Sequence, residues 1–248
     1  MKAQIKAIQE KIRLINHRRE QEDKEHYLLN PPLSESEIIA FEKKYHIQLP
    51  KEYRVFLEYI GNGNQEKYHR HINSLEDSVR FHYTDATILP IHLPFPFSQK
   101  TGLEIIEELT FDFYPAQKVR NILNHNQEGL LQGCLLLNYE GCGTSYMALV
   151  ATGEAKGFIW HVEDMYHPFY TRRGKIIKCY TFLEWFHYLL DEELAPSNME
   201  LIQNKQYSKV TDLNLSGESQ EWRKNCTFED IFKCENLESL ELSRNYTI

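Results

Sequence analysis

Two short runs of apolar residues recur at helical spacing in the first quarter of the chain. The runs consist of Ile38, Phe41 and Tyr45, and then of Tyr53, Phe56, Leu57 and Ile60. Residues three and four apart share one face of a helix, so each run predicts a short amphipathic helix. No residue in either run is of a type that suggests catalysis.

Residues with capping and turn preferences mark the ends of these two helices. Ser34 followed three residues later by Glu37 predicts a capping box at the start of the first helix. Pro50 suits the first position of the second helix, where a missing N–H costs nothing. Residues 61–64 (Gly-Asn-Gly-Asn) accept positive φ angles and are expected to end it.

A seam of isoleucines precedes them, within a highly charged segment of residues 1–30. Ile5, Ile8, Ile12 and Ile15 are spaced three, four and three apart, which predicts a long amphipathic helix. Two interpretations stay open for this seam: the helix packs on its own domain, or it binds a partner or a second copy. Pro31-Pro32 closes the segment, because the residue before a proline avoids helical angles.

Alternating apolar segments predict an antiparallel sheet in the middle of the chain. Three strands are expected over residues 133–139, 144–150 and 157–162, and their short connections contain glycine, which is typical of a meander. Outside this meander we expect an edge strand over 87–93, a short helix over 115–126 and a helix with an apolar stripe over 182–190. Helices around an antiparallel sheet give an α+β domain over residues 31–195.

The last segment, residues 196–248, contains an internal recurrence. Leu213-Asn-Leu215 returns 27 residues later as Leu240-Glu-Leu242, and apolar residues at helical spacing lie between the two. A strand–helix unit of this period predicts a short leucine-rich-repeat-like appendage, although a stable solenoid needs about three repeats and this chain has one interval. A coincidental match is the other interpretation.

Charge and cysteine content indicate which partners and which cellular compartment fit this chain. The chain has a formal net charge of −8, of which −7 falls in residues 31–195. This balance argues against a nucleic-acid-binding protein, which usually has a basic face, and it permits a basic protein partner. The five cysteines form no Cys-x-x-Cys pair, the N-terminus is too polar for a signal peptide, and no apolar run reaches about 20 residues. We therefore expect reduced thiols in a cytoplasmic protein.

The sequence contains no convincing catalytic or cofactor motif. Residues 153–157 have the residue types of a phosphate loop in the wrong order, and Gly143-Thr-Ser145 lacks the second glycine of a nucleophile elbow. His69, His71 and His82 leave open a metal-dependent enzyme as a minor hypothesis, but no cysteine or carboxylate lies at ligand spacing. We expect no catalytic residue, metal or cofactor. The candidate partner-binding residues are acidic: Glu104, Glu107, Glu108, Asp112, Glu163 and Asp164.

Several of these elements together resemble the SUKH superfamily, which includes fungal cell-wall assembly regulators and many bacterial immunity proteins. The resemblance covers roughly residues 31–194. It rests on Leu33-Ser-Glu, Phe41-Glu42, Leu49-Pro50-x-x-Tyr53-x-x-Phe56-Leu57, Gly61-Asn-Gly63, Gly141–Val150, Gly157-Phe-Ile-Trp160 and Phe182-Leu-Glu-Trp185.

This resemblance implies an α+β fold, no catalytic activity and a function in binding. Bacterial members are typically antidotes that bind toxins, often nucleases, so the acidic domain is expected to neutralise a basic toxin partner. The alternative is a regulatory protein-interaction scaffold of the cell-wall assembly regulator type. The charged N-terminal segment and the C-terminal appendage are departures from a minimal member of the family.

Overall fold

The computed structural model divides the chain into two compact units, Met1–Glu193 and Leu194–Ile248, and each is described by itself. The residues that the structure describes are 1–65, 72–80, 88–108, 131–140, 145–163, 166–173, 176–196, 198–210, 212–215, 228–237 and 239–242. In this part of the chain, no helix is both long and apolar enough to cross a membrane.

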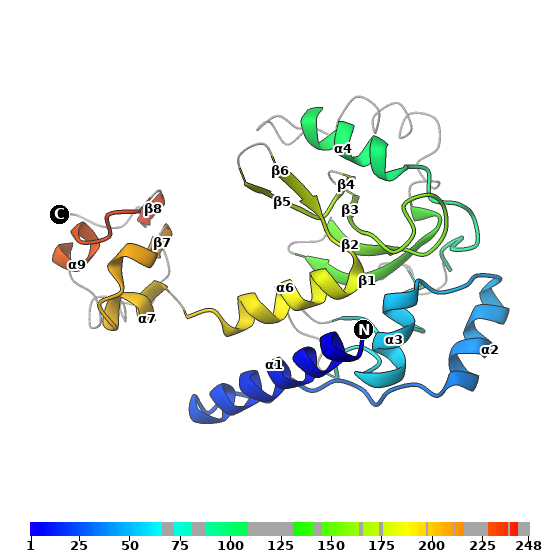
Figure 1. The fold of residues 1–248 in the computed structure, drawn as a ribbon, viewed down its shortest axis with the longest axis horizontal. Coiled ribbons are helices and arrows are strands. Elements are labelled where there is room, and N and C mark those ends of the chain that lie inside the picture. Colours follow the sequence, from blue (N-terminus) through cyan, green and yellow to red (C-terminus); the bar gives the residue numbers. More distant parts are fainter. Residues whose placement is uncertain are drawn as a thin grey trace. The chain divides into compact units, whose positions relative to one another are not determined.

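Three helices open the first unit (Figure 1): α1 (Lys2–Gln21), α2 (Glu35–Tyr45) and α3 (Lys51–Tyr59). The capping box at the start of α2 is present, because Ser34 Oγ accepts from the Glu37 N–H and the Glu37 carboxylate accepts from the Ser34 N–H. Pro50 is the N-cap residue of α3, which therefore begins one residue later than the sequence suggested. After α3, Gly63 adopts φ +73°, where a Cβ would lie 2.6 Å from the backbone of Ile72 and Asn73.

A four-stranded antiparallel sheet of order β1-β2-β3-β4 forms the centre of this unit. Its strands are β1 (Cys134–Glu140), β2 (Ser145–Val150), β3 (Ile159–Glu163) and β4 (His167–Pro168). The predicted meander is therefore confirmed, and with it the α+β fold with a mainly antiparallel sheet.

Aromatic side chains fill the layers on both sides of this sheet. Phe182 of α6 (Phe182–Leu194) packs edge-on against Tyr53 and Phe56 of α3, with ring centroids 4.8 and 5.1 Å apart. Elsewhere Phe95 and Phe97 pack against Trp160 of β3 at 4.8 and 5.5 Å. Figure 1 shows the sheet between α4 (Gln99–Glu108) on one side and α3 and α6 on the other.

Two parts of the first unit differ from the sequence-based expectations. The strand predicted over 87–93 is wrong in the part that the structure describes, because Ile88 makes only an isolated bridge to Arg80 and the chain then turns. Pro90 offers no N–H to a ladder, and its carbonyl instead accepts from the Leu93 N–H. A hairpin of β5 (Tyr170–Arg173) and β6 (Ile176–Cys179) was not predicted. The helix predicted over 115–126 lies outside the described residues.

The second unit has a small core of its own. Its elements are α7 (Asn198–Gln203), the 3-10 turn η2 (Tyr207–Lys209), β7 (Asp212–Leu215), α9 (Phe228–Phe232) and β8 (Ser239–Leu242). The two recurrent Leu-x-Leu segments pair as parallel strands in register, Leu213 with Leu240 and Leu215 with Leu242. The leucine-rich-repeat assignment rests on this one interval and stays a prediction.

Candidate functional site

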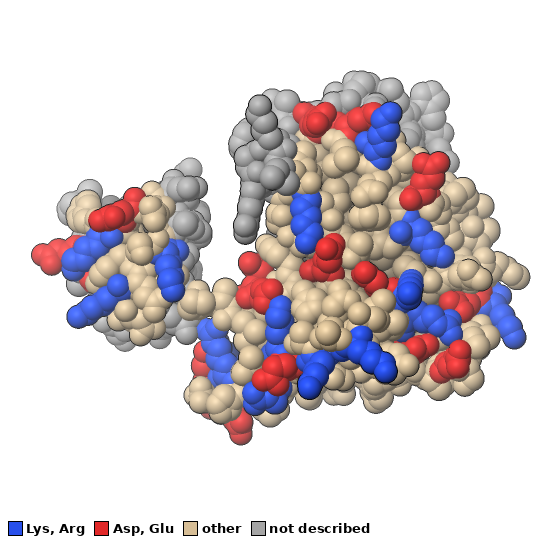
Figure 2. Space-filling view, in the orientation of Figure 1, with Lys and Arg blue, Asp and Glu red and all other residues tan. Residues whose placement is uncertain are grey.

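Helix α4 carries three of the acidic residues that the sequence singled out as partner-binding, namely Glu104, Glu107 and Glu108. Ser98 precedes it, and its Oγ accepts from the Thr101 N–H at 3.1 Å, as an N-terminal cap does. Ile105 and Ile106 are buried, whereas Leu103 is 37% exposed and Glu107 lies on the surface. The helix therefore presents apolar and acidic side chains to solvent, and Figure 2 shows acidic side chains with a basic one beside them over α4.

A close backbone approach fixes α4 to the edge of the sheet. Gly102 lies so near β4 that a Cβ at this position would be 2.5 Å from Pro168 Cγ and 2.9 Å from Trp160 Cζ2. A helix residue with any side chain would have to move away from these two rings. The absence of a side chain at Gly102 thus sets the position of the acidic face relative to the sheet.

The structure describes only part of the predicted acidic set. Glu107 is exposed, Glu104 is half-buried and takes part in a contact, and Glu108 is the last residue of α4. Glu163 is the last residue of β3, which pairs with β4 beneath α4. Asp112 and Asp164, together with the side chains of Glu108 and Glu163, lie outside what the structure describes. The assignment of these six residues to partner binding stays a prediction.

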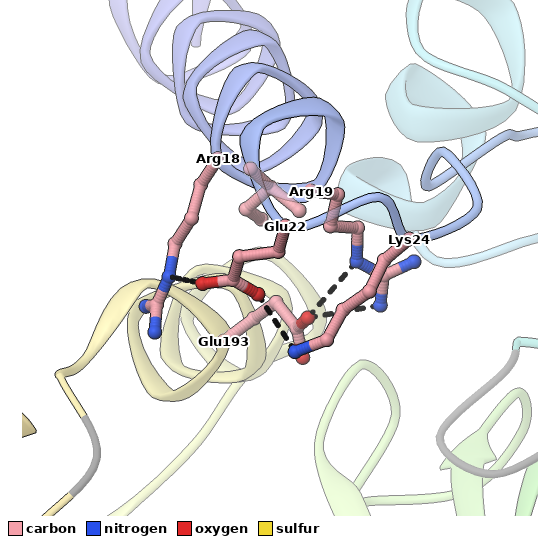
Figure 3. Close-up of a pocket in the computed structure, with 6 residues that line it drawn as sticks. Arg18, Arg19, Glu22, Lys24 and Glu193 are labelled. Atoms are coloured by element: carbon pink, nitrogen blue, oxygen red, sulfur yellow. Dashed lines mark hydrogen bonds and ion pairs between the residues drawn. The ribbon is translucent and has the colours of Figure 1, made fainter. Parts of the chain in front are cut away.

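A second charged site, which the sequence did not predict, lies where the end of α1 meets the end of α6 (Figure 3). A hollow of about 270 Å³ is lined here by Ile15, Arg18, Arg19, Glu22, Lys24 and Glu193. Arg19 binds Glu193 with two hydrogen bonds of 2.9 and 3.2 Å. Glu22 accepts from Arg18 at 2.8 Å and pairs with Lys24 at 2.7 Å, and these two cations lower the pKa of its carboxyl group.

This charged site joins α1 to its own domain. Its carboxylates are already paired with its cations, so it has little unpaired charge to offer a ligand. Along the rest of α1, Ile8 and Ile15 are fully buried, and Lys11 forms an ion pair of 2.6 Å with Asp191 of α6. The structure therefore supports the first interpretation of the isoleucine seam, in which the helix packs within the unit.

A shallow groove beside α2 is a further candidate for protein contact. It also has a volume of about 270 Å³, with Leu33, Phe41 and Leu75 among its apolar lining residues. Lys44 and Glu76 form an exposed ion pair of 3.3 Å at this groove. Their exposure means that the pair contributes little to stability, so it could exchange for contacts with a partner at small cost.

Two histidines lie on the face of the sheet opposite α4, because they alternate along β3 and β4 with Trp160 and Pro168, which face Gly102. His161 of β3 and His167 of β4 are directly paired, and their ring centroids lie 4.7 Å apart. Burial, with a contribution from the neighbouring His167, lowers the pKa of His161 to about 3. Burial also lowers the pKa of His167, against the opposing effect of its hydrogen bond to the Pro168 carbonyl. Both rings are therefore neutral at pH 7.

The histidines considered as zinc ligands, His69, His71 and His82, lie outside the described residues. Within the described ranges, no group of three or more His, Cys, Asp or Glu side chains could hold a metal ion. Cys134 is fully buried, and its thiol has a pKa raised by that burial. A buried neutral thiol is inert, which agrees with a structural function for this cysteine.

Comparisons with known proteins give one match. The model of the SMI1 / KNR4 family (SUKH-1) matches residues 32–185, which is more than half of the chain. No curated protein and no solved structure matches. The matched span begins just before α2 and ends within α6, so it contains the whole four-stranded sheet together with α4.

Proposed function

On the premise that this chain belongs to the SMI1 / KNR4 family (SUKH-1), we propose that it is a non-enzymatic immunity protein that binds and neutralises a toxin in the cytoplasm. The match over residues 32–185 carries this proposal, because many bacterial members of the superfamily are antidotes to toxins. The partner is a cognate toxin domain with a basic surface, and a nuclease is the class that fits best.

The arrangement of α4 supports binding by this region. The helix is held against the sheet by the contact between Gly102 and Pro168, so its acidic face is fixed before any partner arrives. A preformed surface loses less conformational entropy on binding than a flexible one. Leu103 supplies apolar area beside the exposed Glu107, as in interfaces that combine an apolar centre with a charged rim.

Charge supports a basic partner. The domain of residues 31–195 carries a formal net charge of −7, and such a field attracts a positively charged protein and speeds association. A toxin that acts on nucleic acid needs a basic active-site face, because it must bind phosphates. An acidic protein that covers this face would block access of the substrate.

The experiment uses the toxin domain encoded beside this gene. Cells that express this domain should survive only when the chain is co-expressed, and the two purified proteins should form a complex. Glu107→Lys should slow association roughly tenfold at low salt. Glu20→Lys on α1 is the matched control, since it makes the same charge change at another exposed position. If co-expression gave no rescue and the purified proteins formed no complex, the proposal would be contradicted. Equal effects of the two substitutions would contradict the assignment to α4.

A regulatory scaffold of the cell-wall assembly regulator type is the second candidate. The observation that favours it is the unit of residues 194–248, which has its own buried core and lies outside the family match. Phe232 in this unit is 85% exposed and offers an apolar contact. Specific binding of several unrelated host proteins, which is lost in Phe232→Ser, together with the absence of a toxin partner, would favour this candidate.

A further inference from the structure

The hairpin of β5 and β6 is a basic element in an acidic domain (Figure 1). Its two strands contain Arg172, Arg173 and Lys178 and no acidic residue. The domain of residues 31–195 that contains them carries a formal net charge of −7. The total charge argues against a broad nucleic-acid-binding face, because such a face is usually basic. The hairpin is a local exception to this argument.

Three aromatic rings form a cluster at the base of this hairpin. Phe169 precedes β5, Tyr180 follows β6, and Tyr188 belongs to α6. The rings contact one another edge-on, with centroids 5.3 Å apart for Phe169 with Tyr180, 5.3 Å for Phe169 with Tyr188 and 5.9 Å for Tyr180 with Tyr188. All three side chains are half-buried, so part of each remains open to solvent. The cluster thus supplies aromatic surface that the fold holds in place.

The aromatic cluster and a basic side chain lie on the same face of the hairpin. The register pairs Thr171 with Lys178, and directly paired residues of antiparallel strands point to the same face. Thr171 Oγ1 lies 3.0 Å from the hydroxyl oxygen of Tyr180, and Lys178 Nζ lies 4.8 Å from the centre of the Tyr180 ring. This face therefore combines aromatic rings with positive charge, as surfaces that bind single-stranded nucleic acid do.

The ammonium group of Lys178 is available for exchange. It lies 3.1 Å from Glu184 Oε1, and the two side chains are 52% and 37% exposed. An ion pair as exposed as this contributes little to stability, so the ammonium group can move to a phosphate at small cost. Glu184 keeps its other contact in that case, because its Oε2 accepts from the Thr181 N–H at 3.1 Å at the start of α6.

We propose that this face of the hairpin binds single-stranded nucleic acid. Bases stack on the rings of the aromatic cluster, and phosphates pair with the basic residues of β5 and β6. This binding goes beyond the neutralisation of a toxin and does not depend on it.

Two other anionic partners fit the same observations less well. An acidic peptide would use the charge of the hairpin but would bring no planar group to the rings. An anionic membrane surface would require apolar side chains that project into it. The described apolar side chains of this face are half-buried, which suits stacking better than insertion.

The test is a fluorescence anisotropy titration of a labelled single-stranded RNA of about 20 nucleotides with the full chain. At about 50 mM salt we expect a Kd of about 10–100 μM. The slope of log K against log[salt] should be about −2, because three basic residues each contribute about 0.7 on a single strand. Single-stranded DNA should bind within about threefold of the RNA, since stacking and phosphate pairing do not read the sugar. A duplex should bind about tenfold more weakly, because its bases are already stacked on one another.

Photocrosslinking supplies a readout that requires no substitution. RNA that contains 4-thiouridine is irradiated in the presence of the chain, and mass spectrometry identifies the modified peptide. We expect adducts on the peptide that contains Phe169 or the one that contains Tyr180, because these rings would lie against the bases. Adducts confined to other parts of the chain would overturn the proposal.

Substitutions separate stacking from charge. Tyr180→Leu should weaken RNA binding about tenfold, because it removes a stacking ring. Its matched control is Thr171→Val, which removes the same hydrogen bond and keeps the ring, and should bind as the wild type does. Lys178→Gln should reduce the size of the salt slope by about 0.7, whereas Lys156→Gln, at another exposed position, should leave it unchanged.

Circular dichroism confirms that each variant is folded. The absence of RNA binding at about 50 mM salt would overturn the proposal, as would equal effects of the hairpin substitutions and their controls. Binding of polyglutamate or of phosphatidylserine vesicles as tight as that of the RNA would also overturn it, in favour of a surface that responds to negative charge alone.

Discussion

The buried histidine pair predicts that the first unit loses stability as the pH falls below 6.5. A histidine in an unfolded chain has a pKa of about 6.5, whereas burial lowers the pKa of His161 to about 3 in the folded protein. Between these two values the unfolded state binds a proton that the folded state does not. The stabilising contribution of His161 is therefore complete above pH 6.5 and is lost progressively as the pH falls toward 3.

The size of this effect follows from the two pKa values. Between pH 7.5 and pH 5.5, proton binding by the unfolded state lowers the free energy of unfolding by about 1.4 kcal/mol for His161 alone. His167 adds to the loss, because its pKa is also lowered. Carboxylates contribute little in this window, since their ordinary pKa values lie near 4. A loss of this size is a large fraction of the roughly 5–15 kcal/mol that stabilises a typical domain.

Urea unfolding at the two pH values measures the effect, with the fluorescence of the buried Trp160 and Trp185 as the signal. In His161→Phe, the difference in unfolding free energy between pH 7.5 and pH 5.5 should shrink by about 1.4 kcal/mol. His26→Gln, which changes an exposed histidine, should keep the wild-type difference. An unchanged pH difference in His161→Phe would refute the reasoning.

Three further predictions concern packing and capping. Gly102→Ala should lower the free energy of unfolding, measured in urea titrations, by about 1 kcal/mol. Overpacking against Pro168 costs about 1–3 kcal/mol, whereas the higher helix propensity of alanine recovers only about 1 kcal/mol. Ser34→Ala should cost about 1 kcal/mol by the same measurement, since it removes the cap of α2, and Ser36→Ala should cost less. Ile231→Ala should increase hydrogen exchange in residues 194–248 and leave the sheet of the first unit protected, because Ile231 belongs to the core of the second unit.

Local sequence patterns predicted the elements that local interactions determine. The capping box at Ser34 and Glu37 involves residues three apart, so it could be predicted from the sequence and is present in the structure. The meander was also predictable. Its strands are joined by glycine-containing connections of a few residues, and such short connections favour antiparallel pairing of the strands that they join. The hairpin of β5 and β6 was missed, since strands of four residues carry too few positions for a clear alternation.

The position of α4 depends on contacts that no local pattern indicates. No helix was predicted over α4, and Gly102 within a helix is unfavourable on propensity alone. Its reason becomes visible only when Pro168 and Trp160 are found against it. The acidic residues of α4 were identified by composition, whereas their attachment to the sheet edge required the fold. Residue type could therefore suggest the chemistry of the surface but not its rigidity.

The cross-strand row of Asn138, Met147, His161 and His167 shows why neighbours on adjacent strands escape sequence analysis. A bulge in β1 shifts the register, so that Leu136 pairs with Ala148 and Asn138, rather than Leu137, pairs with Met147. In a regular ladder, Leu137 would take that place and Asn138 would point to the opposite face, because a slip of one residue exchanges the two faces of a strand. A single inserted residue thus decides whether an amide or an alkyl group lies beside Met147. Only the strand register, and no spacing within the sequence, brings Met147 next to His161 and His161 next to His167.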